Sequence, residues 1–156
     1  MENDFEWYVL ELSSFQLDDM FKFKADIAIL TNITPDHLDR YNYEMQNYVD
    51  SKFRIIQNQT NSDYFIFNND DPIIKVELAK RKINAIQAPF SLKEEIKYGG
   101  FANEQQLTIN INEQLTMSIH DLALKGKHNS QNSLASGVAA RILEIRKEIV
   151  RESLED

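Results

Sequence analysis

Hydrophobic and polar positions follow one another along the chain in a way that predicts strands and helices in turn. Four short apolar runs are typical of strands, the first ending at Glu11; these runs are residues 5–12, 25–33, 63–70 and 84–91. Two stretches carry apolar residues at every third or fourth position, which predicts helices at residues 42–59 and 71–82. Alternating strands and helices indicate a parallel sheet flanked by helices, in which ligands bind beyond the carboxyl ends of the strands.

The pattern changes in the second half of the chain. Residues 105–124 alternate between apolar and polar around a turn at residues 112–114, which predicts an antiparallel hairpin with one solvated face. After Gly126, apolar residues at helical spacing predict a helix over residues 129–145. The sequence therefore predicts an α/β fold, a mostly parallel sheet flanked by helices with a small antiparallel β appendage.

The composition suits one small globular domain. With 156 residues, 42% of them hydrophobic, the chain is long enough to form a core. We expect residues 1–146 to form part of such a domain and residues 147–156 to begin a linker or helix. No apolar run approaches the length of a membrane span, and no charged-then-apolar leader opens the chain. Together with the lack of cysteine, this leads us to expect a cytoplasmic protein that contacts no membrane.

Charge and glycine usage limit the ligands. The net charge of −8 argues against nucleic acid, because neutralising its phosphates needs clustered lysine and arginine. A nucleotide bound through magnesium is compatible with this charge, because the metal supplies positive charge of its own. Only four glycines occur, and none forms a GxxxxGKS/T or GxGxxG motif. If the domain handles phosphates, the usual phosphate loop is not within this sequence.

Two residues near predicted strand ends are candidate metal ligands. Glu11 ends an apolar strand, where its carboxylate would either bind a hard cation such as Mg²⁺ or point into solvent. In the stretch TPDH, Thr34 suits an N-cap and Pro35 the first helical position, which puts His37 in the first helical turn. The positive end of a helix favours a neutral imidazole, which either binds a metal or bonds to nearby backbone.

A lysine and two asparagines are the other candidates. Lys52 lies in the middle of the apolar stripe of its predicted helix, between Tyr48 and Ile56. Its ammonium either reaches the rim of the stripe or is held partly desolvated as a neutral amine that can react. Asn129 and Asn132 lie one turn apart at the start of the last predicted helix. Both amides would face one ligand, or Asn129 would simply be the N-cap.

These candidates belong to a set of motifs that resembles the central, ATP-binding domain of the Mur ligases. The motifs are ELSSFQL (11–17), TNITPDHLDRY (31–41) with Lys52 fifteen residues after His37, FNNDDP (67–72) and LKGKHNSQN (124–132). The resemblance covers about residues 7 to 145. Phe15-Gln16-Leu17, after the paired serines, is similar to the branch of the family that adds D-glutamate.

The resemblance implies ATP-dependent amide formation in peptidoglycan synthesis. ATP phosphorylates the carboxylate of UDP-N-acetylmuramoyl-L-alanine, and the amine of D-glutamate then attacks the acyl phosphate. In such a ligase Glu11 ligates the Mg²⁺ that bridges the ATP phosphates, and His37 ligates a second Mg²⁺. Lys52 is the lysine that CO₂ carbamylates, and the resulting anion supports the second metal.

The resemblance also implies the substrate contacts and the rest of the enzyme. Asn129 and Asn132 face the adenine side of ATP, whereas Ser13 and Gln16 lie toward the muramoyl substrate. Family members also have a domain for the uridine nucleotide, a phosphate loop and a domain for D-glutamate, so we expect the isolated chain to be inactive. Two alternatives stay open: a non-catalytic binding domain on the same sheet, and a folylpolyglutamate synthase-like ligase, against which ELSSFQL argues.

Overall fold

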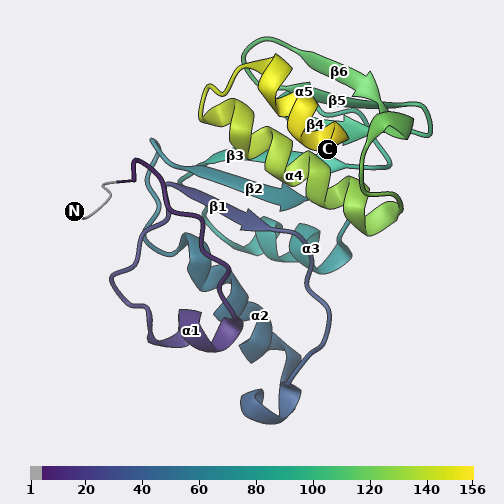
Figure 1. The fold of residues 1–156 in the computed structure, drawn as a ribbon. Helices are drawn as coiled ribbons and strands as arrows, with labels where there is room; N and C mark the ends of the chain where they lie inside the picture. The colour runs from purple at the N-terminus through teal and green to yellow at the C-terminus, as the bar shows by residue number, and fades with distance from the viewer. Residues whose placement is uncertain (1–4) are drawn as a thin grey trace.

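A six-stranded sheet runs through the centre of the molecule (Figure 1). The computed structural model describes residues 5–156. The strands are β1 (Ile27–Leu30), β2 (Tyr64–Asn68), β3 (Ile86–Ser91), β4 (Gly99–Ala102), β5 (Gln106–Asn110) and β6 (Leu115–Ser118). They lie side by side in chain order. Strands β1 to β4 pair in parallel, whereas β5 pairs antiparallel with both β4 and β6.

The predicted hairpin consists of β5 and β6, and it continues the main sheet through β4. The hydrophobic pattern does not predict β4, because Gly99 and Gly100 interrupt it. Both glycines are required by close contacts. A Cβ at Gly99, where φ is 143°, would lie 2.0 Å from the carbonyl oxygen of Pro89, and one at Gly100 would lie 3.0 Å from a methyl carbon of Leu134. The two glycines therefore let β4 pair with β3 and let a helix lie close above it.

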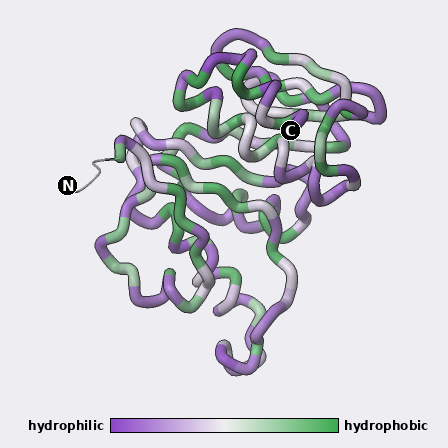
Figure 2. The backbone as a smooth tube through the Cα atoms, in the orientation of Figure 1, coloured by the Kyte–Doolittle hydropathy of each residue, from purple (hydrophilic) through white to green (hydrophobic). Residues whose placement is uncertain are grey.

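Helices cover both faces of the sheet. One face is covered by α4 (Lys127–Ile142) and α5 (Lys147–Glu155), and the other by α2 (Met45–Phe53) and α3 (Pro72–Lys80) (Figure 1). Strand β2 shows the division, because Ile66 packs in the cluster on the α4 side, whereas Phe65 and Phe67 pack on the α2 side. In Figure 2 the hydrophobic colour accordingly follows the strands. The shorter helices are α1 (Ser14–Asp19) and the 3₁₀ helices η1 (Leu38–Tyr41), η2 (Arg54–Ile56) and η3 (Ile119–Asp121).

The strand predicted at residues 5–12 is wrong for this structure. The segment is irregular, and its side chains are mostly in solvent, with Val9 fully exposed and Tyr8 71% exposed. Strand β1 forms the edge of the sheet, and no other strand of residues 5–156 lies beyond it. The outer edge of β1 leaves backbone donors and acceptors unpaired, and in this structure the segment does not pair with them. Glu11 consequently does not end a strand.

The other predicted strands and the helices predicted at residues 42–59, 71–82 and 129–145 are confirmed, with bounds that differ by several residues. Helix α3 begins one residue after Asp71, whose side chain accepts hydrogen bonds from the N–H groups of Ile73 and Ile74. The charged tail forms α5, and Val150 of this helix is buried in the cluster on the α4 side. Among the residues that the structure describes, no helix is both long enough and apolar enough to cross a membrane.

Candidate functional site

The sequence predicted that His37 lies in the first turn of a helix that follows Thr34, but the structure does not place it there. It lies directly before η1 in a left-handed conformation, with φ of 48°. Its carbonyl oxygen accepts the N–H of Arg40 at 3.1 Å, so the helical turn begins after His37 rather than after Thr34. The imidazole is 63% exposed, and its Nε2 lies 3.6 Å from Oδ1 of Asp36. The ring is therefore open to solvent beside one carboxylate.

An aromatic cluster, formed by Phe15, Tyr41 and Tyr48, connects His37 with Lys52. The ring centre of His37 lies 5.5 Å from that of Phe15, which stacks on Tyr41 at 6.1 Å. Tyr41 in turn meets Tyr48 edge to face at 5.5 Å, and Nζ of Lys52 lies 5.6 Å from the ring centre of Tyr48. Three separate elements, α1, η1 and α2, thus place the predicted histidine and lysine at the two ends of one cluster.

The electrostatics of this cluster are set by burial and by Asp36. Burial raises the pKa of Tyr48, and the negative charges of Asp36 and Tyr41 raise it further. The hydroxyl of Tyr41 lies within hydrogen-bond distance of the Asp18 carboxylate, at 3.1 Å, and of the Ser51 hydroxyl, at 3.2 Å, so this ring is fixed in place. Lys52 is partly buried and forms no ion pair with any residue of the described chain. Its ammonium is instead held by the face of an aromatic ring.

Ser13 and Gln16, the predicted substrate contacts, bond to each other. Ser13 is the N-cap of α1, and its hydroxyl accepts the N–H of Gln16 at 3.3 Å. The side-chain oxygen of Gln16 accepts the N–H of Ser13 at 2.9 Å, which completes a capping box. Both side chains are exposed, as is Glu11 two residues earlier. In this structure the two residues hold the start of α1.

Asn129 is not an N-cap, because α4 begins earlier than predicted. Gly126 is the N-cap, and Asn129 is the third residue of the helix. Its side-chain nitrogen donates to the carbonyl of Lys125 at 2.8 Å, whereas Asn132, one turn later, is exposed. A cavity of about 540 Å³ lies next to this helix start and is lined by Gly126 and others. The asparagine pair therefore lies on the α4 face of the sheet, and His37 and Lys52 lie on the α2 side.

Side chains of α2 and of the residues after it hold a segment that we call the amino-terminal strap, residues 14–25. Five of them donate to backbone carbonyls of the strap. The pairs run in the same order along both segments: Ser51 with Ser14, Arg54 with Leu17, Gln57 with Met20, Asn58 with Phe21 and Phe23, and Gln59 with Ala25. The sequence interpretation missed these contacts, and their only local signal is the run of amides in Gln57-Asn58-Gln59.

The end of the strap is also fixed by an ion pair. Nζ of Lys24 lies 2.6 Å from Oδ1 of Asp63, which is almost fully buried. Burial pushes the pKa of Asp63 upward, but hydrogen bonds from Lys24 and Thr60 outweigh this effect, and the pKa of Asp63 is lowered. The same hydrogen bond raises the pKa of Lys24. The carboxylate therefore stays charged at neutral pH and holds the strap against the sheet.

The predicted magnesium ligands are not assembled into a complete metal site. Imidazole and carboxylate are suitable donor types, and His37 does lie beside Asp36. Within residues 5–156, however, no group of three histidine, aspartate or glutamate side chains could hold a metal ion. Mg²⁺ needs near-octahedral oxygen coordination, which these two side chains do not supply. In this structure the predicted ligands therefore form only part of a metal site.

Comparison with known proteins shows relatives along nearly the whole chain. Residues 1–140 match the family model described as the Mur ligase middle domain. A relative from Bacteroides fragilis, named UDP-N-acetylmuramoylalanine--D-glutamate ligase, is 52% identical over 155 residues, which are 99% of this chain and 35% of the relative. A protein of the same name from Christiangramia forsetii is 49% identical over 150 residues, or 96% of this chain and 34% of the relative. The chain thus spans about a third of the length of the curated relatives that it matches.

Two solved structures share the fold. MurF from Acinetobacter baumannii superposes with a TM-score of 0.62 at 18% identity, over 85% of this chain and 29% of that one. An L. casei FPGS mutant superposes with a TM-score of 0.53 at 15% identity, over 86% of this chain and 34% of that one. At these identities the likeness concerns the fold alone.

Proposed function

The chain belongs to the Mur ligase family, and on that premise we propose that it is part of a ligase that joins D-glutamate to UDP-N-acetylmuramoyl-L-alanine. The observation that carries this proposal is the 52% identity over 155 residues with relatives of that name. The reaction belongs to peptidoglycan synthesis, and we place it in the cytoplasm with ATP as co-substrate. Because the chain spans about a third of these relatives, the activity is proposed for the parent protein.

The chemistry is amide formation through an activated carboxylate. The terminal carboxylate of UDP-N-acetylmuramoyl-L-alanine attacks the γ-phosphorus of ATP, which gives an acyl phosphate and ADP. The amine of D-glutamate then attacks the acyl carbon, the C–O bond to phosphate breaks, and phosphate leaves while the amine loses a proton. Two magnesium ions would neutralise the phosphate charges in the parent protein, but the side chains present here are too few to hold them.

Within this chain we propose that His37 and Lys52, which lie on either side of the aromatic cluster, act where the acyl phosphate forms. The ammonium of Lys52 would first lose a proton. The neutral amine would then add to CO₂, forming a C–N bond, and release a second proton, which leaves a carbamate anion in place of the original cation. The position of its ammonium, partly buried and over an aromatic ring rather than in an ion pair, supports this role. The carbamate, His37 and Glu11 would then be the metal ligands.

The other proposed contacts lie elsewhere in the chain. Asn129 and Asn132, at the start of α4, would face the adenine of ATP, and Ser13 and Gln16 would lie toward the muramoyl substrate. We also propose that residues 1–146 form part of one domain, that residues 147–156 lead out of it, and that the isolated chain does not turn over ATP. The first four of these residues lie outside the part that the structure describes.

A chimaera tests the proposal. This chain would replace the matching third of the Bacteroides fragilis relative, and release of phosphate would be measured with ATP, UDP-N-acetylmuramoyl-L-alanine and D-glutamate. We expect turnover that depends on D-glutamate. His37→Ala and Lys52→Ala should each lower kcat at least about 100-fold, the loss expected when a ligand or its support is removed.

Lys97→Ala is the control, because Lys97 is exposed and lies in the loop before β4, away from the aromatic cluster and from the start of α4. It should leave kcat unchanged. Normal turnover by the His37→Ala and Lys52→Ala chimaeras would contradict the assigned roles. ATP turnover by the isolated chain would contradict its proposed inactivity, and acceptance of another amino acid in place of D-glutamate would contradict the proposed reaction.

A further inference from the structure

A cavity of about 240 Å³ lies near the amino ends of strands β2 and β3, and neither His37 nor Lys52 lines it. It is bordered by the end of α2 and by the residues that lead into β2 and β3. These are the amino ends of two parallel strands, whereas His37 follows the carboxyl end of β1. The cavity is therefore separate from the proposed ligase site, and an inference from it does not rest on the proposed function.

Gln59 contributes a fixed hydrogen-bond acceptor to this cavity. The residue is only 3% exposed, and its Nε2 donates both hydrogens, to the carbonyl of Ala25 at 3.0 Å and to that of Tyr64 at 2.8 Å. Turning the amide over would put its oxygen against two carbonyl oxygens, so the orientation is set. Its Oε1 is then left buried and without a partner among the described residues. A buried acceptor of this kind requires a donor.

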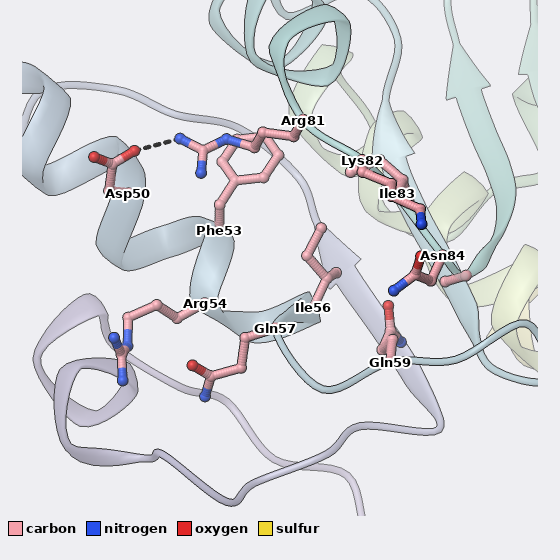
Figure 3. Close-up of a pocket in the computed structure, with 11 residues that line it drawn as sticks. Asp50, Phe53, Arg54, Ile56, Gln57, Gln59, Arg81, Lys82, Ile83 and Asn84 are labelled. Carbon is pink, nitrogen blue, oxygen red and sulfur yellow. Dashed lines mark hydrogen bonds and ion pairs between the residues drawn. The ribbon is translucent and has the colours of Figure 1, made fainter.

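The wall opposite Gln59 carries donors. Figure 3 shows the amide of Gln59 directed toward Asn84, while Arg54 extends away from it toward the strap. Lys82 and Asn84 both line the cavity and are exposed, and in the part of the chain described neither makes a side-chain hydrogen bond or ion pair. Arg81, by contrast, is already paired with Asp50 (Figure 3) and also with Glu77. One ammonium and one amide are therefore available to a ligand.

The remaining lining is apolar. Phe53, Ile56 and Ala85 line the cavity between the polar walls. A ligand that matches all of these groups has an N–H or O–H donor for Gln59, a negatively charged acceptor for Lys82 and a small apolar part for the rest of the lining. A volume of about 240 Å³ accommodates a molecule of the size of a branched amino acid.

We propose that this cavity binds a small carboxylate that carries an N–H or O–H donor on the neighbouring carbon. The donor bonds to Oε1 of Gln59, and the carboxylate lies against Lys82 and Asn84. Two sources share this chemistry, α-amino acids and 2-hydroxy acids. A hydroxyl donates to Gln59 without adding a second positive charge near Lys82, whereas an ammonium adds one.

The test is a titration of the chain followed by nuclear magnetic resonance of its backbone and side-chain amides. Leucine and 2-hydroxy-4-methylpentanoate carry both groups, and 4-methylpentanoate lacks the donor. We expect saturable shifts of the amides of Gln59 and Asn84 with at least one of the first two. The acid without the donor should bind about fivefold more weakly than that compound, which is the usual worth of one hydrogen bond. The ratio between the first two identifies the class of donor.

Variants separate specific binding from a cavity that holds water only. Lys82→Gln removes the charge at an exposed position and should weaken binding about threefold. Lys97→Gln is the matched control, because Lys97 is exposed and does not line the cavity. Equal affinity for all three acids would overturn the proposal, and so would shifts that do not saturate. Equal effects of Lys82→Gln and Lys97→Gln would also overturn it.

Discussion

The two faces of the sheet are held in different ways. Under α4, apolar side chains pack directly on the strands, and Leu134 and Val138 have no exposed surface. On the α2 side, the strap is held by a row of polar side chains that donate to backbone carbonyls. Full burial of a leucine side chain contributes about 2 kcal/mol, whereas one exposed hydrogen bond contributes about 1 kcal/mol or less. Since buried apolar clusters lie on both faces of the sheet, packing on the strands contributes most of the stability, and the polar row determines whether the strap stays in place.

Leu134→Ala should have the largest effect on stability. The substitution leaves a cavity between α4 and the glycine pair of β4, because the side chain of Leu134 packs against Gly100. We expect the free energy of unfolding to fall by about 3 kcal/mol, measured by urea denaturation. Val76→Ala, at a position 53% exposed on α3, is the control and should change it by less than about 0.5 kcal/mol. Equal losses would mean that α4 does not dominate the core.

Glu77→Gln should have the next largest effect and should change the response to acid. Glu77 is 3% exposed, and it accepts hydrogen bonds from Lys80, Arg81 and Gln46, which join α3 to α2. Burial pushes the pKa of Glu77 upward, but these hydrogen bonds outweigh it and lower the pKa below its ordinary value of 4.5. We expect a loss of about 2 kcal/mol at pH 7.

The sign of the pH dependence follows from this lowered pKa. A carboxyl group whose pKa is lower in the folded state contributes stability above its unfolded pKa and loses it as the pH falls through the folded value. The wild-type chain should therefore lose stability as the pH falls below about 4.5, and Glu77→Gln should flatten part of that slope. Parallel urea midpoints for both proteins from neutral to acid pH would show that Glu77 does not contribute.

Asn58→Ala should have the smallest effect on global stability and a clear local one. Asn58 donates to the carbonyls of Phe21 and Phe23 at 3.0 and 2.7 Å from an exposed position. We expect a loss below about 1 kcal/mol, together with faster hydrogen exchange in the strap and unchanged exchange in β2 and α4. Asn61→Ala is the control, because Asn61 is exposed and bonds to none of the described residues through its side chain. If β2 also exchanged faster, the strap would belong to the global folding unit.

The sequence predicted those parts of the fold whose signals are local. The apolar run of β2 and the alternation in β5 and β6 are each contained in a few residues, so they could be read without knowing the neighbours. The segment 5–12 has the same local pattern but pairs with no strand, although the outer edge of β1 is unpaired, so the local pattern alone did not determine its structure. Strand β4 has neighbouring strands but lacks the hydrophobic pattern, because Gly99 and Gly100 allow Pro89 and α4 to lie close to it.

The candidate site was predictable only residue by residue. The sequence singled out His37 and Lys52, but not the aromatic cluster that lies between them, because its members come from three separate elements. The sequence predicted the start of the helical turn at Thr34, because the capping rules consider only side chains. The turn instead begins at His37, whose backbone carbonyl accepts its first hydrogen bond. The strap contacts were missed because donor and acceptor are mostly 37 residues apart in the chain.

The order of the strands has a consequence for how the chain acquires its structure. Each strand is paired with the one that precedes it in the sequence, so no pairing has to wait for a distant part of the chain. Loop closure for the parallel pairs then proceeds in successive steps of 37, 22 and 10 residues, and its entropic cost grows only slowly with their length. A chain leaving the ribosome could add β2 to β1, then β3 to β2, in the order of synthesis. The strap, whose donors follow about 37 residues behind it, would be secured only once α2 has formed.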